Sequence, residues 1–206
     1  MSKKSNVKEF FLKSGKKNVK NIRALDLIEK VYPDLNYNKS LKASHFIRQN
    51  FEFIKKKFKP SASLCGSIFE YLIMCVFFRN DIHPFYYQTK LAFVPTIKYD
   101  LVLFDSKKKP IILNLKLNSG QSYKMVELES FVAKQVYKNS ECNFITYYND
   151  DLRSLEKRKD NREIQFTDNF YSAQEKEFDA FIKKLSKKDF FDPGYINIVE
   201  EGIELR

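Results

Sequence analysis

The sequence lacks the features by which several common enzyme classes are recognised. It contains no tryptophan, five glycines and two histidines among its 206 residues. It shows no internal repeat, no glycine-rich loop of the kind that binds phosphate, and no serine, histidine and aspartate pattern typical of a hydrolase triad. The histidines, His45 and His83, are far in sequence from the strands described below, so we expect neither to be needed for catalysis.

Cysteine is also scarce, and its positions argue against two kinds of site. Cys65, Cys75 and Cys142 lie in apolar runs, and their spacing suits neither disulfide pairing nor zinc. They are typical of reduced core residues in a cytosolic protein. The longest apolar run is interrupted by Glu70, and the basic N-terminal segment lacks an apolar stretch of signal type. We therefore expect a soluble, cytoplasmic protein with no membrane association.

Positive charge is concentrated in the first third of the chain. The formal net charge is +11; residues 1–60 contain 16 Lys and Arg against 5 Asp and Glu, whereas residues 61–206 contain 21 of each. Because phenylalanines are interleaved with these lysines, we expect a folded basic helical module at 1–60 that contacts a polyanion, followed by a core at 61–206. A lysine-rich solvated surface would explain the same charge equally well.

Hydrophobic periodicity predicts an α/β protein. Helical spacing occurs in six segments: 6–20, 22–31, 41–58, 63–79, 121–138 and 172–187. Aromatic and β-branched residues indicate four strands: 86–94, 96–104, 111–117 and 142–148. We expect the charged stretch 150–165 to be a loop or short helix, and 195–206 to be a hairpin or edge strands. The predicted fold is a central mixed β-sheet flanked by helices, with an N-terminal helical module.

One charged residue lies in the most apolar segment of the chain. Residues 61–78, SASLCGSIFEYLIMCVFF, are apolar or small except for Glu70. A helix that is apolar on all sides lies inside a domain. An unpaired carboxylate there is costly unless a metal ion, a cation or a proton compensates it. Glu70 is therefore a candidate functional residue.

Two neighbouring predicted strands carry further polar residues. Asp100 lies in KYDLVLF, and Asn114 and Lys116 lie in IILNLKL. Because side chains alternate along a strand, Asn114 and Lys116 share one face, and Asp100 faces away from Tyr99 and Leu101. We expect the two strands to bring Asp100 and Lys116 close to each other. Taken singly, Asp100 would be an exposed carboxylate at a strand end and Lys116 a lysine that extends from the sheet into solvent.

This order of elements resembles the PD-(D/E)XK nuclease superfamily. The matching residues, within 61–148, are Glu70 in GSIFEYL, Asp100 in KYDLVLF and Lys116 in LNLKL. The resemblance implies hydrolysis of phosphodiesters with a divalent metal ion. Carboxylates bind Mg²⁺, which offsets charge on the phosphate and lowers the pKa of the attacking water, while the lysine stabilises the developing negative charge or positions that water.

One position departs from the superfamily's pattern. The residue two before Lys116, usually Asp or Glu, is Asn114. An amide oxygen coordinates metal without bringing negative charge, so Mg²⁺ binding should weaken unless another carboxylate substitutes. Three explanations compete: a natural inactive relative, deliberate removal of the acid, or an acid supplied from elsewhere in the chain.

A glutamate in the following helix favours the third explanation. At about 100° per residue, Glu129 points to the same side as the apolar positions of that helix, whereas Glu127 points roughly away. The apolar positions that we expect to face the core are Met125, Leu128, Val132 and Val136.

The position of Glu129 extends the resemblance to some type II restriction endonucleases. In those enzymes a small polar residue replaces the strand acid, and a helix glutamate fills the same space. Twelve residues separate Lys116 from Glu129, close to the spacing in that variant. Alternatively, Glu129 pairs with Lys124 or Lys134 on its own helix.

The sequence therefore predicts a Mg²⁺-dependent DNA endonuclease, most plausibly a type II restriction enzyme. Asp100 and Glu129 or Asn114 would hold the metal ion, Glu70 would be an auxiliary acid at the metal, and Lys116 would contact the scissile phosphate.

The expected partner is double-stranded DNA, gripped by the basic module. Because a two-fold symmetric DNA site calls for two active sites, we also expect a homodimer. Two alternatives stay open: a catalytically inactive nuclease fold that binds DNA or a protein, which Asn114 favours, and a structure-specific nuclease that acts on branched DNA in repair or at junctions.

Overall fold

The computed structural model covers most of the core that the sequence predicts at residues 61–206. The described residues are 7, 11, 21–34, 39–120, 122–149, 152–192 and 203–205. The helix expected at 6–20 lies outside the described residues except for two buried apolar positions, Val7 and Phe11. Most of the expected terminal hairpin also lies outside them.

Among the described residues, three full helices precede the sheet, close to the predicted positions. They are α2 (Ile22–Val31), α3 (Ala43–Phe58) and α4 (Ala62–Arg79). The side chain of Asn21 accepts a hydrogen bond from the backbone N–H of Ala24, and Ser61 does the same for Leu64. These N-caps satisfy N–H groups that the first turn leaves without an intrahelical partner, and so determine where α2 and α4 begin.

Helix α4 is the central helix of the domain. Its length and apolar composition would suit a membrane span, but 67% of its apolar window is buried inside the protein. Residues of α2, α3 and α4 pack into one apolar cluster with the sheet and with Phe178 and Ile182. The enclosure of α4 by protein is consistent with a soluble protein, as the sequence indicates.

The α/β fold with a central mixed sheet is confirmed. The strands are β1 (Phe85–Leu91), β2 (Val94–Phe104), β3 (Pro110–Lys116), β4 (Glu141–Thr146), β5 (Asn169–Ser172) and β6 (Ile203–Leu205), in the spatial order β5-β4-β3-β2-β1-β6. β1, β2 and β3 form an antiparallel meander, and β6 is antiparallel to β1. β3, β4 and β5 are parallel.

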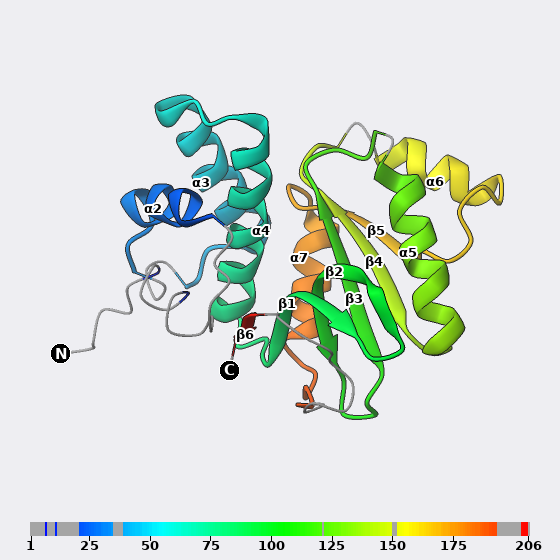
Figure 1. Ribbon diagram of the computed structural model, residues 1–206. Helices are drawn as coiled ribbons and strands as arrows, with labels where there is room; N and C mark the ends of the chain where they lie inside the picture. Colours follow the sequence, from blue (N-terminus) through cyan, green and yellow to red (C-terminus); the bar gives the residue numbers. More distant parts are fainter. Residues whose placement is uncertain are drawn as a thin grey trace.

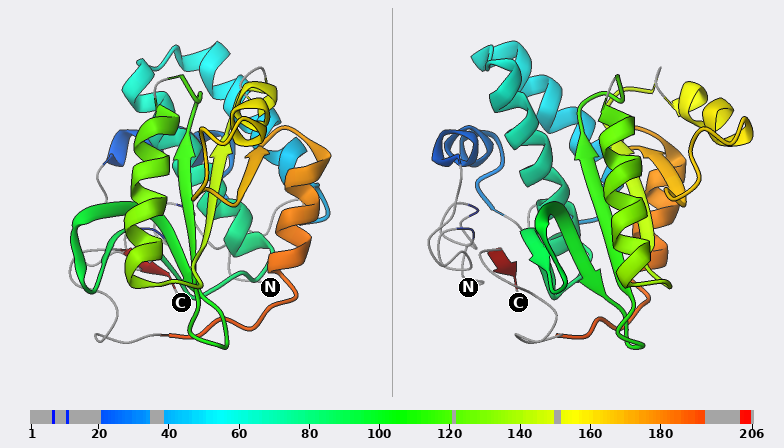
Figure 2. Two further views of the ribbon diagram at one scale, coloured as in Figure 1. Left: turned by 90° about the vertical axis from the view of Figure 1, so that its right-hand side faces the viewer. Right: turned by 45° about the vertical axis from the view of Figure 1, so that its right-hand side comes forward.

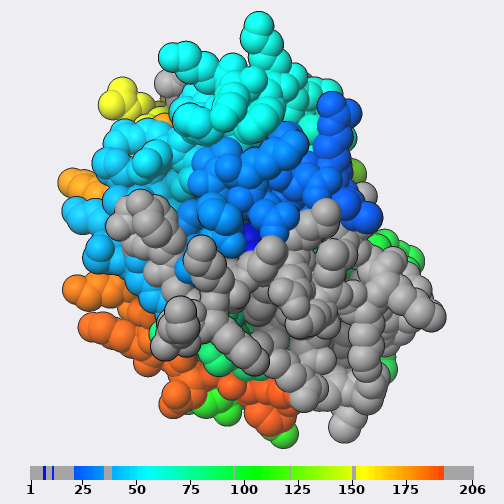
Figure 3. All heavy atoms as spheres, turned by 90° about the vertical axis from the view of Figure 1, so that its left-hand side faces the viewer, coloured from blue at the N-terminus to red at the C-terminus, as the bar shows by residue number. Residues whose placement is uncertain are grey.

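Helices cover both faces of this sheet (Figure 1). α4 and α7 (Lys176–Leu185) lie on one face, and α5 (Ser122–Val136), which connects β3 to β4, lies on the other (Figure 2). α2 and α3 pack on the outside of α4, and their side chains form much of the surface on that side of the molecule (Figure 3). The site described below lies where β2 and β3 pass between α4 and α5.

Two elements after β4 differ in how well the sequence predicts them. The charged stretch contains α6 (Leu152–Asp160), one of the two predicted alternatives, with Leu155 as its buried residue. β5 was not predicted, because its four residues are too short and only partly buried to give an alternating pattern. It is held as a strand by parallel pairing with β4, from Asn143 with Asn169 to Thr146 with Ser172.

The predicted inward face of α5 is wrong. Met125, Leu128 and Val136 are exposed, with 57%, 54% and 41% of their surface accessible. The buried residues of α5 are Val126, Ser130 and Ala133. The buried face is therefore rotated about the helix axis by about one residue, roughly 100°, from the predicted face. The helix has apolar side chains on more than one side, and packing on β2 determines which of them are covered.

Candidate active site

An ion pair joins the two polar strand residues that the sequence singles out. Lys116 Nζ lies 2.8 Å from Asp100 Oδ2. Asp100 is 7% exposed, while the side chain of Lys116 is 33% exposed and so reaches the surface. The hairpin of β2 and β3 thus brings Asp100 and Lys116 together as expected. An opposite charge at this distance in a partly buried site is screened less than a surface pair.

Two further donors hold the carboxylate of Asp100. The backbone N–H of Leu115 donates to Oδ2 at 2.8 Å, and Gln88 Nε2 donates to Oδ1 at 2.8 Å. An ionised carboxylate has about four acceptor positions, so three donors leave Oδ1 with room for one more ligand. Asp100 is therefore held in one orientation and keeps one lone pair for a metal ion or a water molecule.

Gln88 is a site residue that the sequence reasoning missed. Its φ of 51° lies in the left-handed region, and the pairing of β1 with β2 shifts register between Thr89 and Leu91. Such irregularities bend a strand and redirect a side chain. The signal in the sequence was a lone amide among the aromatic residues of FYYQTKL, but nothing there indicated that its backbone would leave the regular strand conformation.

Asn114 occupies the position next to this pair. Leu113 pairs with Leu101 across β2 and β3, so Asn114 and Asp100 face each other one residue beyond that pair. Asn114 is 1% exposed, and neither Oδ1 nor Nδ2 has a hydrogen-bond partner within the part of the chain that the structure describes. A buried amide without partners is costly, which indicates that this position serves something other than packing.

Glu129 reaches the site from α5. Burial raises the pKa of Glu129 to about 7, with Lys116 opposing the increase and Asp100 adding to it. Neither expected alternative partner is paired with it: Lys134 binds Asp168 at 2.6 Å, and Lys124 is exposed. Among the described residues, Glu129 makes no ion pair within 4 Å, so its carboxylate is available near Lys116.

Glu70 approaches the sheet from the opposite side. Tyr87, on β1, donates a hydrogen bond of 2.5 Å to Glu70 Oε2. Burial, followed by the charge of Glu70, raises the pKa of the Tyr87 hydroxyl, which therefore stays protonated and keeps donating. Tyr87 thus orients the carboxylate of Glu70, the acid of α4.

The charges of Asp100, Glu129 and Glu70 all act on the pKa of Lys116. Burial lowers the pKa of Lys116, but the charge of Asp100 and the hydrogen bond to it, with smaller contributions from Glu129 and Glu70, outweigh burial. The net shift of the Lys116 pKa is upward. Lys116 therefore remains a cation at neutral pH, with acids approaching it from α4, β2 and α5.

Glu127 belongs to a different part of the molecule, as expected from its position on α5. Its carboxylate accepts hydrogen bonds from the backbone N–H groups of Gln165, Phe166 and Thr167 at 2.5, 2.8 and 3.0 Å. It also accepts one from the Thr167 hydroxyl at 2.9 Å. Glu127 thus anchors the loop before β5, while Glu129 faces the site.

The oxygen donors present here fit a hard divalent cation. Asp100 keeps one free acceptor position, Glu129 has an unpaired carboxylate, and the buried Oδ1 of Asn114 lacks a donor. No group of three or more His, Cys, Asp or Glu is arranged to hold a metal ion in the described part of the chain. Carboxylate and amide oxygens are ligands of the kind that Mg²⁺ takes, commonly one or two carboxylates with several waters.

Comparison with known proteins identifies no relative. No protein-family model, no curated protein and no solved structure matches the chain.

Proposed function

We propose that the protein is a Mg²⁺-dependent endonuclease of double-stranded DNA, of the PD-(D/E)XK superfamily and of the type II restriction class. The observation that carries this proposal is the partly buried ion pair of Asp100 and Lys116, with the carboxylate of Glu129 near enough for the charges of both to act on its pKa. A fixed acid on β2, a second acid on α5 and a cation at the end of β3 are groups that suit metal-assisted hydrolysis of a phosphodiester.

Each residue has a distinct role in this proposal. Asp100, Glu129 and the amide oxygen of Asn114 would hold Mg²⁺, which supplies charge neutralisation at the phosphate and a more acidic water. Lys116 places a positive charge where the phosphate gains negative charge. Glu70, held by Tyr87, keeps the local field negative near Lys116 and so favours its protonated form.

A basic surface lies close to the same end of the sheet. The last turn of α3 carries Lys55, Lys56 and Lys57. Lys55 Nζ donates to the Tyr148 hydroxyl at 3.0 Å, and the backbone N–H of Tyr148 bonds to Leu117, directly after β3. In this proposal these lysines would contact the backbone of DNA bound at Lys116, with an affinity that falls steeply as salt increases. We propose a homodimer and a cytoplasmic location.

The test is incubation with long unmethylated duplex DNA and Mg²⁺, beside an EDTA control. We expect discrete fragments that require Mg²⁺, and no cleavage by Asp100→Asn or Lys116→Met. Glu163→Gln is the matched control, because it removes an exposed ion pair with Arg158, 2.6 Å long, away from the site. Full cleavage by Asp100→Asn or Lys116→Met would refute the site.

A catalytically inactive DNA-binding protein is the second candidate. It is favoured by the amide at Asn114 and by the three donors that already occupy Asp100. In that case DNA binding is unchanged by Mg²⁺, and Asp100→Ala has no effect on it. A branched junction substrate distinguishes the third alternative, since a structure-specific nuclease cuts it regardless of sequence and leaves linear duplex intact.

A further inference from the structure

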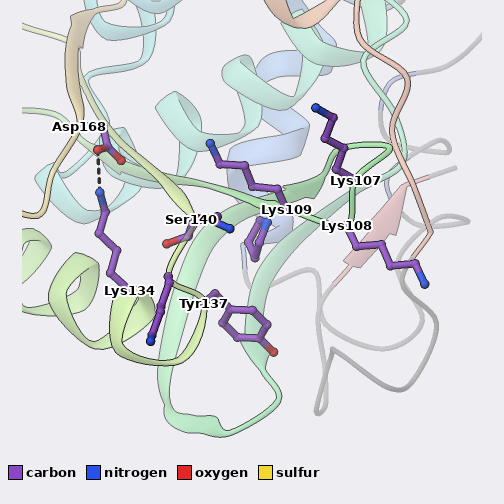
Figure 4. Close-up of a pocket in the computed structure, with 10 residues that line it drawn as sticks. Lys107, Lys108, Lys109, Lys134, Tyr137, Ser140 and Asp168 are labelled. Carbon is purple, nitrogen blue, oxygen red and sulfur yellow. Dashed lines mark hydrogen bonds and ion pairs between the residues drawn. The ribbon is translucent and has the colours of Figure 1, made fainter.

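A lysine-lined hollow lies at the other end of the same hairpin. It has a volume of about 620 Å³ and lies between the turn that joins β2 to β3, the C-terminal end of α5 and the start of β4 (Figure 4). β3 begins in the hollow at Pro110 and ends at Lys116. Six steps of a strand, at about 3.3 Å each, place the hollow roughly 20 Å from the candidate active site.

The hollow carries much more positive than negative charge. Its charged lining consists of Lys107, Lys108, Lys109, Lys134, Lys138 and Asp168. Asp168 Oδ1 pairs with Lys134 at 2.6 Å, and Asp168 Oδ2 accepts the backbone N–H of Cys142 at 2.7 Å. Each carboxylate oxygen of the single acid in the lining thus already has a partner, and the other four lysines have no acid within 4 Å in the described structure.

The turn holds its lysines in a defined arrangement. Asp105 Oδ1 accepts the backbone N–H groups of Lys107 and Lys109, at 3.0 and 2.9 Å, and the N–H of Lys108 bonds to the Asp105 carbonyl at 2.8 Å. Asp105, the acid of this turn, therefore binds backbone N–H groups and makes no ion pair with the ammonium groups in the described structure. Lys107 and Lys109 extend in the same general direction, whereas Lys108 extends away and lies 5.2 Å from the centre of the Phe191 ring (Figure 4).

The dipole of α5 explains the presence of only some of these lysines. Lys134 and Lys138 lie at the C-terminal end of α5, where cations offset the negative end of the helix dipole. The lysines of the turn belong to no helix, and their mutual repulsion opposes folding. Ser140 and Asn139 add neutral hydrogen-bonding groups to the same lining. Ammonium groups beside neutral donors are the chemistry that binds phosphate.

We propose that this hollow is a phosphate-binding site, with Lys107, Lys109 and Lys138 as its principal cations. The phosphates belong either to the backbone of a nucleic acid or to a free polyphosphate, which present the same chemistry. The proposal does not depend on catalysis at Asp100, because all of its residues lie at the opposite end of β3.

Lysine accessibility gives a direct test at the level of single residues. The intact protein is treated with an amine-acetylating reagent in EDTA, with no ligand, with duplex DNA or with inorganic tripolyphosphate, and acetylation is read by mass spectrometry. We expect a ligand to protect Lys107, Lys109 and Lys138 at least threefold, and to leave the exposed Lys183 and Lys187 of the α7 region unprotected. Protection by DNA alone identifies a nucleic acid backbone, and protection by tripolyphosphate identifies a small phosphate ligand.

A binding measurement tests the same site independently. The triple variant Lys107→Gln, Lys109→Gln, Lys138→Gln is compared with Lys176→Gln, Lys183→Gln, Lys187→Gln, which removes equal charge from exposed positions elsewhere. If the backbone of DNA occupies the hollow, the slope of log K against log salt falls by about 0.9 for each lost phosphate contact in the first variant only. If tripolyphosphate is the ligand, only the first variant loses its binding, by about tenfold or more.

Two results would overturn the proposal. One is absence of selective protection with both ligands. The other is equal weakening of binding by the two triple variants, which would show that general charge and not the hollow attracts phosphate. Thermal unfolding of both variants serves as the folding control. A protein that never cuts DNA still passes these tests, so failure of the nuclease proposal is distinguishable from failure of this one.

Discussion

Gln88 holds the carboxylate of Asp100 from a backbone position that leaves the regular strand conformation. Its Nε2 lies 2.8 Å from Asp100 Oδ1, and its φ is 51°. A residue other than glycine in the left-handed region costs roughly 1–2 kcal/mol, so the contact is maintained against local strain. This relationship links an irregularity in β1 to the orientation of the acid in β2.

Two substitutions of Gln88 distinguish the effect of its hydrogen bond to Asp100 from the effect of its strained backbone. Gln88→Ala and Gln88→Gly both remove the donor to Asp100, and the loss of a hydrogen bond to a charged group, about 1.5–3 kcal/mol, should lower kcat/KM by roughly tenfold or more. Only Gln88→Gly relieves the backbone, so it should be more stable than Gln88→Ala by about 1 kcal/mol in urea. Unchanged cleavage by both variants would contradict a positioning role for Gln88.

Asn114 should show opposite effects on stability and metal binding. Asn114→Leu removes two buried polar atoms without partners and should raise the free energy of unfolding by about 1–3 kcal/mol, while weakening Mg²⁺ binding. Asn114→Asp adds an acid facing Asp100, so it should destabilise the metal-free protein and tighten Mg²⁺ binding. Thermal unfolding with and without Mg²⁺ measures both. A Mg²⁺ response of Asn114→Leu equal to that of the wild type would place the metal ion elsewhere.

Glu129 predicts a specific dependence of stability on pH. Its pKa is about 7 in the folded protein, above the ordinary 4.5, so between these values the folded state holds a proton that the unfolded state has lost. Stability should therefore fall as pH rises from 4.5 through 7. Glu129→Gln should remove this decline, so its stabilising effect grows with pH; the change in Tm at pH 5 and pH 8 measures it. An equal change in Tm at both pH values would contradict the raised pKa.

Mg²⁺ should release a proton if it binds Glu129. A cation beside the carboxylate lowers its pKa, so binding at pH 6.5 should expel about three-quarters of a proton, and binding at pH 8.5 almost none. Titration calorimetry in two buffers of different ionisation enthalpy measures the number of protons released on Mg²⁺ binding. The measurement does not require the protein to be catalytically active. Glu129→Gln is the control and should release none at either pH.

Glu127 should affect stability but not the site. Glu127→Ala leaves three backbone N–H groups of residues 165–167 without their acceptor and should lower the free energy of unfolding by about 2 kcal/mol. Because Glu127 faces the loop before β5, Mg²⁺ binding should be unchanged. Urea unfolding and metal titration of this variant beside Glu129→Ala test the division of roles on α5, and a loss of Mg²⁺ affinity in Glu127→Ala would refute it.

The sequence by itself determined the order of the main elements and predicted five residues of the candidate site: Asp100, Lys116, Glu70, Asn114 and Glu129. Alternation along β2 and β3 places Asp100 and Lys116 near each other, because pairing in a hairpin has few possible registers. Glu70 could be identified because packing in the core does not explain a charged side chain in the middle of an apolar helix. These are local signals, carried by neighbouring residues.

Only the tertiary structure decided the features that depend on packing between distant segments. The covered face of α5 follows from its contact with β2, so Glu129 points inward although Met125, Leu128 and Val136 do not. The bend at Gln88 depends on the pairing of β1 with β2, and the lysine hollow forms where a turn meets a helix end. Periodicity reports which side chains are apolar, but contacts far apart in sequence determine which of them are buried and which polar groups meet.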